Sequence, residues 1–528
     1  MKLTDLNNNT IEGYILPKFD VESMREKTAK ECKWVHFGAG NIFRGFPAAR
    51  MQDLLEKGLS DTGIVVGEGF DFQIIDDIYH KYDNNTLLVT LKGSGKVDKR
   101  VISSVAASYK ATPTEKADFD KLSEIFKNPA LQMASFTITE KGYGIDSPFI
   151  LSDIDKGPES CETIIPTVTA LALERYNSGA FPFSFVSMDN CSHNGEKLRN
   201  AVLFVADEWL KKGFVKKEFV EYITDESKVA FPWSMIDKIT PRPDENIQKM
   251  LVEDGFEDNE VLITKKHTYI APFVNSEESE YLVIEDSFPN GRPKLEEAGI
   301  YFTDRTTVNK VEKMKVCTCL NPLHTAMSIA GCLLGYKKIS DEMEDVDIVK
   351  YIKGIGYVEG LKVVVDPKII EPKAFIDDVV DNRLMNPFMP DTPQRISTDT
   401  SQKIAIRFGE TVKSYMASEE LDESELKLIP FFMATYIRYL MGIDDNGDEF
   451  TLSPDPRHEE LWALVRDIKL KEYSYDEAEK LIAPILKLND LWGFDLYNSK
   501  LKESVVVDFT KLVSNIGMVR KSLHEILK

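Results

Sequence analysis

The sequence has few cysteines, fewer basic than acidic residues, and no recognisable targeting segment. Six cysteines in 528 residues are too few and too scattered for a secreted disulfide framework, so we expect reduced, intracellular thiols. Lys plus Arg number 65 against 87 Asp plus Glu, which gives a formal net charge of −22. An acidic surface repels phosphate backbones and anionic lipids, so we expect no nucleic-acid or membrane partner. The first residues, MKLTDLNNNTIEGY, lack a basic start followed by an apolar run, which predicts a cytoplasmic location.

No apolar stretch long enough to span a membrane is free of polar residues. The longest one, residues 316–336, is long enough to raise the question of a transmembrane helix. Asn321, Pro322 and His324 interrupt it near its start, and such side chains are rare inside membrane spans. The stretch therefore predicts a buried helix with polar groups at its beginning.

What the chain does contain is enough apolar material for a globular protein of several domains. Hydrophobic residues make up 43% of the chain and aromatic residues 10%, which favours a folded core over disorder. Short apolar runs alternate with helical patterns in the first part of the chain. Strands are expected at 63–68, 87–91, 133–139 and 183–188, and helices at 115–127 and 165–177.

This alternation predicts an α/β fold whose mostly parallel sheet is covered by helices on both faces. After about residue 305, strand-like runs become rare and long helical patterns dominate. We therefore expect an N-terminal domain of residues 1–305 and a mostly α-helical C-terminal domain of residues 306–528.

A glycine-rich turn joins a strand to a helix within residues 33–58. Gly38 permits a tight turn, Gly40 lets the backbone approach a pyrophosphate, and Phe43 occupies the third glycine position. Taken alone, the turn also suits simple packing of a strand against a helix. A second strand, which ends at Glu68, favours a dinucleotide site.

A carboxylate at the end of that second strand accepts hydrogen bonds from an adenosine ribose and repels a 2′-phosphate, which predicts NAD rather than NADP. Glu68 lies 30 residues after Gly38 instead of the usual ~20, so Asp71 stays open as the alternative acid. The candidate cofactor-binding residues surround the turn and the end of the second strand: Gly38, Gly40, Asn41, Ile42, Phe43, Arg44, Glu68 and Asp71.

Two later clusters carry polar groups suited to alcohol chemistry. Asn190 directly follows a strand, where open α/β sheets present side chains to ligands, although a cap or turn role is equally open. Asn194-Gly195 is predicted to be a helix cap or a turn. Further along, Glu312, Lys315, Asn321 and His324 surround the start of the apolar helix.

A lysine beside apolar walls loses hydration, so its pKa falls toward the operating pH and it can exchange a proton. Asn190 and Asn321 can donate to a developing alkoxide, and His324 can orient the oxygen. Cys317 and Cys319 near His324 also suggest zinc, but they supply only three ligands at unusual spacing. We therefore expect core thiols and no metal.

At these residues the sequence resembles the polyol-specific long-chain dehydrogenase family, the mannitol dehydrogenase and hexuronate reductase group. The similar segments run along most of the chain: GAGNIFRGF (38–46), TITEKGYG (137–144), SMDN with HNG (187–195), MIDKITP (235–241), YLVIEDSFPNGRP (281–293), the cluster from Lys315 to His324, and RISTDTSQK (395–403). The resemblance implies an NAD-binding Rossmann-type domain, a helical C-terminal domain and a metal-free active site between them.

The resemblance also implies roles for residues at matching positions. The catalytic set is Lys315, Asn190, Asn321 and His324, with Glu312 as proton relay and Arg395 and Lys403 as substrate-binding residues. Family members have four residues between the Lys and the Asn, whereas this chain has five, VCTCL. One extra residue rotates a helical face by ~100°, so Lys315 must precede the helix or lie on a bulge, with Lys313 as the alternative.

The implied activity is the NAD-dependent interconversion of a secondary alcohol of a hexonate or polyol and its ketone. We expect D-mannonate and D-fructuronate as the substrate pair. Mannitol and fructose, or altronate and tagaturonate, are the alternatives within the family. A protein that binds NAD without turnover is the alternative from another class. The sequence leaves the oligomeric state open.

Overall fold

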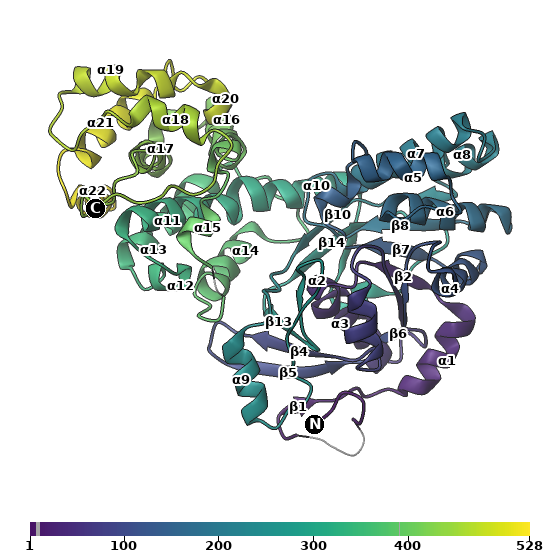
Figure 1. Ribbon diagram of the computed structural model, residues 1–528. Helices are drawn as coiled ribbons and strands as arrows, with labels where there is room; N and C mark the ends of the chain where they lie inside the picture. The colour runs from purple at the N-terminus through teal and green to yellow at the C-terminus, as the bar shows by residue number, and fades with distance from the viewer. Residues whose placement is uncertain (7–10, 390) are drawn as a thin grey trace. The chain divides into compact units, whose positions relative to one another are not determined.

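The computed structural model describes residues 1–6, 11–389 and 391–528. The chain divides into two compact units. The N-terminal unit comprises Met1–Lys92 and Lys96–Asn309, and the C-terminal unit comprises Gly93–Gly95 and Lys310–Lys528. Strands are confined to the first unit apart from one short bridge, and the second is helical over its described residues (Figure 1).

A six-stranded parallel sheet organises the N-terminal unit. Its order is β6 (Val105–Lys110), β3 (Ile64–Glu68), β2 (Trp34–Phe37), β7 (Met133–Phe136), β8 (Phe183–Ser187) and β9 (Val229–Ala230). All neighbouring pairs are parallel. Counted along the chain, this is the Rossmann order 3-2-1-4-5-6, which reverses direction between β2 and β7. Ligands bind at the carboxyl ends of the strands beside such a reversal.

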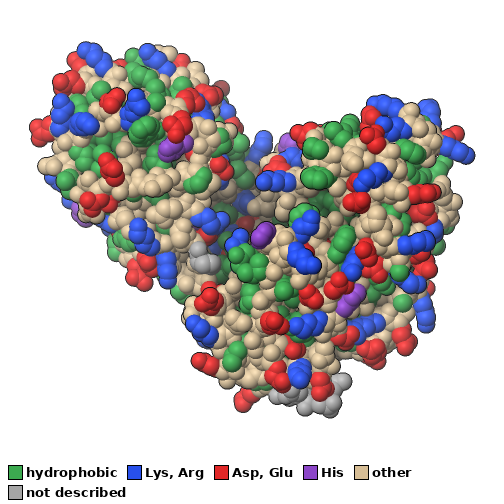
Figure 2. Space-filling model, viewed as in Figure 1, with side chains coloured by type: hydrophobic (Ala, Val, Ile, Leu, Met, Phe, Trp, Pro, Cys, Tyr) green, Lys and Arg blue, Asp and Glu red, His purple; other side chains and the backbone are tan. Residues whose placement is uncertain are grey.

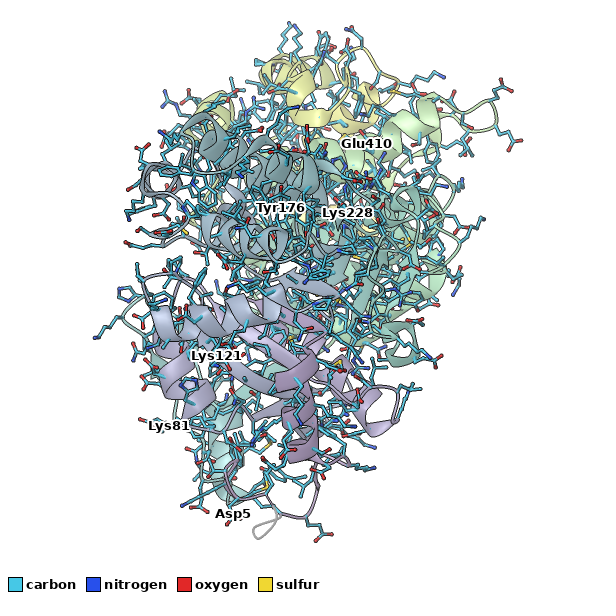
Figure 3. All side chains as sticks on the ribbon, turned by 90° about the vertical axis from the view of Figure 1, so that its right-hand side faces the viewer. Asp5, Lys81, Lys121, Tyr176, Lys228 and Glu410 are labelled. Carbon is cyan, nitrogen blue, oxygen red and sulfur yellow. The ribbon has the colours of Figure 1, made fainter. Side chains whose placement is uncertain are left out.

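Helices cover the sheet, which explains why its strands are almost continuously apolar. β2, β3, β7 and β8 are buried along their whole length. Helices α4 (Lys116–Lys127), α6 (Ile164–Asn177) and α7 (Asn194–Lys211) lie side by side along the sheet (Figure 1). Tyr176 of α6 packs against Phe219 and Tyr222 of α8 (Lys217–Thr224) within this layer (Figure 3). The predicted Rossmann-type α/β fold is confirmed.

Two predicted strands differ from the observed ones. The run at 87–91 forms β4 (Thr86–Leu91), which belongs to a separate sheet. The order of that sheet is β1 (Tyr14–Ile15), β5 (Val97–Ile102), β4 and β13 (Phe273–Glu277). There β4 is antiparallel to β5 (Val97–Ile102) and parallel to β13 (Phe273–Glu277). The run at 133–139 ends as a strand at Phe136, because side-chain contacts take over the next backbone groups, as described below.

The remaining elements of the N-terminal unit frame these sheets. They are β1 (Tyr14–Ile15), α1 (Val21–Glu31), α2 (Asn41–Gly45), α3 (Pro47–Glu56), η1 (Ile75–His80), η2 (Glu140–Tyr143), α5 (Pro148–Lys156), β10 (Ser234–Asp237), α9 (Glu245–Glu253), β11 (Leu262–Ile263), β12 (Tyr269–Ile270), β14 (Tyr281–Glu285), η3 (Leu295–Ala298) and β15 (Tyr301–Thr303).

The C-terminal unit is built around two buried helices. α11 (Asn321–Leu334) packs against α13 (Val346–Lys353), α15 (Pro393–Ile396) and α17 (Leu428–Tyr439). α17 is buried at every residue. The carboxylate of Glu359 accepts hydrogen bonds from the backbone N–H groups of Lys427, Leu428 and Ile429 at 2.6–2.9 Å. These bonds satisfy the open N-terminus of α17, which would otherwise bury unpaired donors.

The other helical elements of this part of the chain surround α11 and α17. They are α10 (Arg305–Met314), η4 (Lys315–Cys319), α12 (Ile339–Glu342), α13 (Val346–Lys353), η5 (Gly354–Gly360), α14 (Pro372–Asp378), η6 (Val379–Arg383), α15 (Pro393–Ile396), η7 (Thr400–Gln402), η8 (Ala405–Gly409), α16 (Glu410–Met416), η9 (Glu423–Glu425), α18 (His458–Val465), α19 (Tyr475–Leu486), α20 (Asn489–Trp492), α21 (Lys502–Leu512) and α22 (Met518–Ile526).

Among the described residues, one helical segment, Arg305–Leu334, is long and apolar enough to cross a membrane by length and composition. Within its most apolar window, 72% of the residues are buried inside the protein. Leu323, Met327 and Ile329 are fully buried. This burial is what the sequence predicts for a core helix with a polar start.

Candidate active site

The glycine-rich turn lies at the carboxyl end of β2, beside the reversal of strand order. Gly38 has φ +109°, and a Cβ at this position would overlap the carbonyl oxygen of Thr137 after β7. Only glycine fits both the backbone angle and this close approach. At Gly40, in contrast, a Cβ would meet no heavy atom within 4 Å. The backbone there is uncovered, which suits the approach of a pyrophosphate.

Phe43 fills the third glycine position because of the residue beneath it. Its buried ring stacks on His36 of β2, with centroids 4.0 Å apart and planes 12° from parallel. His36 is held by the hydroxyls of Ser135 and Thr137 at 2.7 and 2.9 Å. Burial lowers the pKa of His36 to about 3, so the ring is neutral. The helix and the strand are thus joined by two stacked rings instead of a close glycine contact.

Arg44 fixes the first turn of the helix from inside. Its side chain is buried and donates to the carbonyl oxygen of Ala271 and to Oδ1 of Asn41, both at 2.7 Å. Burial lowers the pKa of Arg44 to about 10. Asn41 and Ile42 remain half-buried at the surface of the turn. Pro47 ends this short helix, because a residue before proline is pushed out of the α region, and Phe46 has φ −133°.

The two candidate acids at the end of β3 are both buried and hydrogen-bonded. Glu68 accepts from the backbone N–H of Ala39 at 2.8 Å through Oε2, and from Phe70 and Asp71 at 2.8 and 3.1 Å through Oε1. Burial raises the pKa of Glu68, although these N–H groups oppose the shift. Asp71 accepts from the Thr264 hydroxyl at 2.5 Å. Glu68 therefore ties the glycine turn to β3, and one acceptor position on Oε2 remains.

A carboxylate after β8 organises the loop after β7. Asp189 accepts from the backbone N–H groups of Ile138 and Thr139 at 3.0 and 2.8 Å and from the Tyr143 hydroxyl. These bonds explain why the strand stops at Phe136. They also hold Thr139 at φ +66°, an unfavourable angle for a β-branched residue. Backbone strain of this kind is typical of functional loops.

Asn190 follows directly and is exposed at the carboxyl end of β8. Asn194-Gly195, predicted to be a helix cap or a turn, form the first two residues of α7, directly after its N-cap residue His193. The side-chain N–H of Asn194 donates to the hydroxyl of Ser234 in β10, and Oδ1 of Asn194 accepts from the backbone N–H of Ser234, both at 3.0 Å. Gly195 is required because a Cβ would lie 2.7 Å from the carbonyl oxygen of Pro232.

The lysine cluster lies where α10 passes into α11 in the C-terminal unit. Lys315–Cys319 form a π-helical turn, closed by a 3.1 Å bond from the N–H of Leu320 to the carbonyl oxygen of Lys315. A π-turn holds one more residue than an α-turn, so it absorbs the extra residue as the expected bulge. Lys315 is 4% exposed, whereas Lys313 is exposed. Of the two lysines, only Lys315 has the buried setting that the prediction requires.

Asn321 begins α11, with Pro322 in its first turn as predicted. His324 lies three residues later, so the two half-buried side chains share one helical face. Oδ1 of Asn321 is buried and has no hydrogen-bond partner among the described residues. Buried acceptors of this kind are rare and are satisfied by a ligand or water. Glu312 is half-buried and lies three residues before Lys315.

The thiols near this cluster are protonated. Burial raises the pKa of Cys317 to about 11 and raises that of Cys319 further. A zinc ligand must be a thiolate, so this setting disfavours metal binding. Among the residues that the structure describes, no group of three His, Cys, Asp or Glu side chains is placed to hold a metal ion.

The predicted substrate-binding residues lie beside a third cation that the sequence analysis missed. Arg395 pairs with Asp391, and Nζ of Lys403 donates to the carbonyl oxygen of Thr398 at 2.8 Å. Burial lowers the pKa of Lys403, and the nearby charges of Arg407 and Arg395 lower it further. The sequence contains no pattern that indicates a role for Arg407, because it is a single charged residue in the region predicted to be helical.

The fold and the site residues define a Rossmann-type oxidoreductase with a helical second unit. The family model for the mannitol dehydrogenase Rossmann domain matches residues 32–297, and the model for the mannitol dehydrogenase C-terminal domain matches residues 307–513. The chain belongs to the mannitol dehydrogenase family. The predicted resemblance is confirmed.

Known relatives cover nearly the whole chain. A D-mannonate oxidoreductase of Thermotoga maritima is 50% identical, with 99% of each chain covered. A polyol:NADP oxidoreductase of Gluconobacter oxydans is 27% identical, with 93% of each covered.

Two solved structures are 25% identical to the chain. A D-sorbitol dehydrogenase in substrate-free form has a TM-score of 0.79, with 96% of this chain and 97% of that chain covered. A Pseudomonas fluorescens mannitol 2-dehydrogenase in a ternary complex with NAD and D-mannitol has a TM-score of 0.69, with 100% and 99% covered.

Proposed function

We propose that this protein is an NAD-dependent oxidoreductase that interconverts D-mannonate and D-fructuronate. The observation that carries the proposal is the 50% identity to the Thermotoga maritima D-mannonate oxidoreductase over 99% of both chains. The mannitol 2-dehydrogenase of Phaeosphaeria nodorum, in comparison, is 28% identical. Substrate preference within a family follows from the residues around the substrate, so the nearer relative is the better guide.

The glycine turn fits NAD. Gly40 leaves backbone uncovered next to the first turn of a helix, and Glu68 keeps one acceptor position beside that turn. We propose that this position accepts a hydrogen bond from the adenosine ribose and disfavours a 2′-phosphate. Asn41, Ile42, Phe43 and Arg44 are proposed to shape the turn. When bound, NAD accepts a hydride from the carbinol carbon of the substrate.

The proposed catalytic roles follow the chemistry of each side chain. The Lys315 amine takes the proton of the substrate hydroxyl, and Glu312 passes it to water. Asn190 and Asn321 donate to the oxygen on which negative charge develops, and His324 orients that oxygen. In the reductive direction the Lys315 ammonium returns the proton to the new alcohol.

Arg395 and Lys403 are proposed to bind the remote end of the substrate. Remote contacts position the reacting carbon, so they affect turnover as well as affinity. We also propose that residues 1–305 form the cofactor-binding domain and residues 306–528 the substrate-binding, catalytic domain.

Oxidation of NADH with a panel of ketoses tests the substrate assignment. We expect fructuronate to give a kcat/KM at least ~100-fold above that of fructose, as a charge-assisted contact to a carboxylate would provide. Tagaturonate in the same assay distinguishes the altronate alternative. Equal rates with fructose and fructuronate contradict the assignment. Bound NADH that is not oxidised by any ketose in a single turnover identifies a binding protein without catalysis.

The partner of this protein is a small molecule, which we propose to be a sugar acid. We propose that it binds neither nucleic acid nor membranes and is cytoplasmic. Acidic and basic side chains are interspersed on the visible face of each unit, with no large field of positive charge (Figure 2). Cell fractionation and a filter-binding assay with DNA check these two points.

A further inference from the structure

We propose that Arg407 recognises the carboxylate of the substrate and so selects a sugar acid over a neutral sugar. The inference rests on the proposed function and extends it to a residue with no role assigned above. The guanidinium is mostly buried, and burial lowers the pKa of Arg407 to about 10. A guanidinium that stays charged at neutral pH in such a setting needs acceptors for its N–H groups, which buried Arg44 finds in the carbonyl oxygen of Ala271 and Oδ1 of Asn41.

The protein itself supplies the Arg407 side chain with one such acceptor. Across residues 1–6, 11–389 and 391–528, Arg407 forms no ion pair, and its side chain makes one hydrogen bond, from Nη1 to the Thr325 hydroxyl. Glu410, the next acid along the chain, is exposed and pairs with Lys413 (Figure 3). Four of the five N–H donors of the guanidinium therefore remain for a ligand.

Arg407 is connected to the segments that carry the candidate catalytic residues. Thr325, which accepts the Arg407 hydrogen bond, donates its own hydroxyl to the carbonyl oxygen of Asn321 at 2.8 Å. The segment that carries Arg407, η8, packs against both η4, which begins at Lys315, and α11. On this packing we base the inference that one end of a six-carbon substrate meets the guanidinium while its carbinol lies near the Lys315 amine.

The local charge balance also favours an anion. Lys403 lies close enough to Arg407 and Arg395 for both to lower its pKa, so three cations share this region. Arg395 is paired with Asp391, and the carboxylates of Asp399 and Asp455 lie near Lys403 and oppose the fall in its pKa. Among the described residues, Arg407 is therefore the cation of this group that no acid faces. A planar carboxylate matches the forked donors of an arginine better than a hydroxyl does.

Variants at Arg407 test the inference with fructuronate and fructose as paired substrates. Arg407→Met should lower kcat/KM for fructuronate by roughly 10²- to 10³-fold. It should change kcat/KM for fructose by less than ~10-fold and leave the Kd for NADH unchanged, so the preference for the anion collapses. Arg407→Lys should recover part of the preference, because it keeps the charge but not the fork.

Two control variants separate recognition from structure. Lys413→Met removes an exposed charge on the next helix and should leave the preference unchanged. Thr325→Val removes the hydrogen bond to Arg407 but keeps the guanidinium, so it should reduce the preference for fructuronate by less than Arg407→Met does.

If the wild-type protein prefers fructuronate, two outcomes overturn the inference alone. In the first, the Arg407→Met variant keeps this preference within ~3-fold. In the second, Arg407→Met loses activity toward both substrates equally. A wild-type protein that does not prefer fructuronate overturns the proposed function and the inference together.

Discussion

The carboxyl group of Glu342 should make the stability of the C-terminal unit depend on pH. The side chain is fully buried against Gly331 in the middle of α11, and neither carboxyl oxygen has a hydrogen-bond partner among the described residues. Burial, with a smaller contribution from the charges of Asp345 and Asp341, raises the pKa of Glu342 well above its usual value of 4.5. Arg520 pairs with Asp345 and not with this group.

The sign follows from proton linkage. Because the folded state binds the proton more tightly than the unfolded state, the stabilisation is complete below pH 4.5 and is lost as the pH rises through the folded-state pKa. One proton is involved, so the free energy of unfolding falls by ~1.4 kcal/mol per pH unit in this window. For a unit of this size, ~1.4 kcal/mol corresponds to a change in Tm of roughly 3–6 °C.

The Glu342→Gln variant measures this effect, because its amide keeps the shape of the side chain and does not titrate. Calorimetry from pH 4.5 to 8 should show little difference at the acid end. The variant should then gain roughly 3–6 °C over the wild type per pH unit. Glu344→Gln, a change at an exposed neighbour, is the matched control and should give a constant difference. A constant difference for Glu342→Gln as well would refute the reasoning.

Three further changes test the site. Lys315→Ala should lower turnover by ~10²- to 10⁴-fold in steady-state assays while the Kd for NADH stays within ~2-fold, and near-normal turnover would remove Lys315 from the mechanism. Gly38→Ala forces a Cβ into the carbonyl oxygen of Thr137 at φ +109°, so fluorescence titration should show NADH affinity at least ~10-fold weaker. Phe43→Gly restores the third glycine but removes the ring that stacks on His36. Urea unfolding should therefore show a free energy of unfolding lower by ~3–5 kcal/mol. A variant as stable as the wild type would contradict the packing argument.

Local patterns predicted those parts of the fold that local physics determines. The strand and helix around the glycine turn follow from the spacing of apolar residues and from glycines at fixed offsets. The same patterns do not determine which strands pair. Leu87, Leu88 and Val89 are buried on both faces of β4, so the run looks like a central parallel strand although it lies in another sheet.

The site was predicted only in part, for a similar reason. Lys315, Asn321 and His324 stand close together in the chain, so their spacing carries information. Asp189 reads as a turn former, and its role in holding the loop after β7 is visible only from tertiary contacts. Arg407 lies 82 residues after Thr325, and nothing in its neighbours indicates that they meet.

The direction of the Lys315 side chain depends on the number of residues in the π-turn at Lys315–Cys319. Removing one residue between Val316 and Thr318 would let the segment return to ordinary helical pitch and swing the Lys315 side chain by about a quarter of a revolution. Gain or loss of a single codon here would therefore redirect the side chain of Lys315, the proposed proton acceptor, without replacing any reactive group.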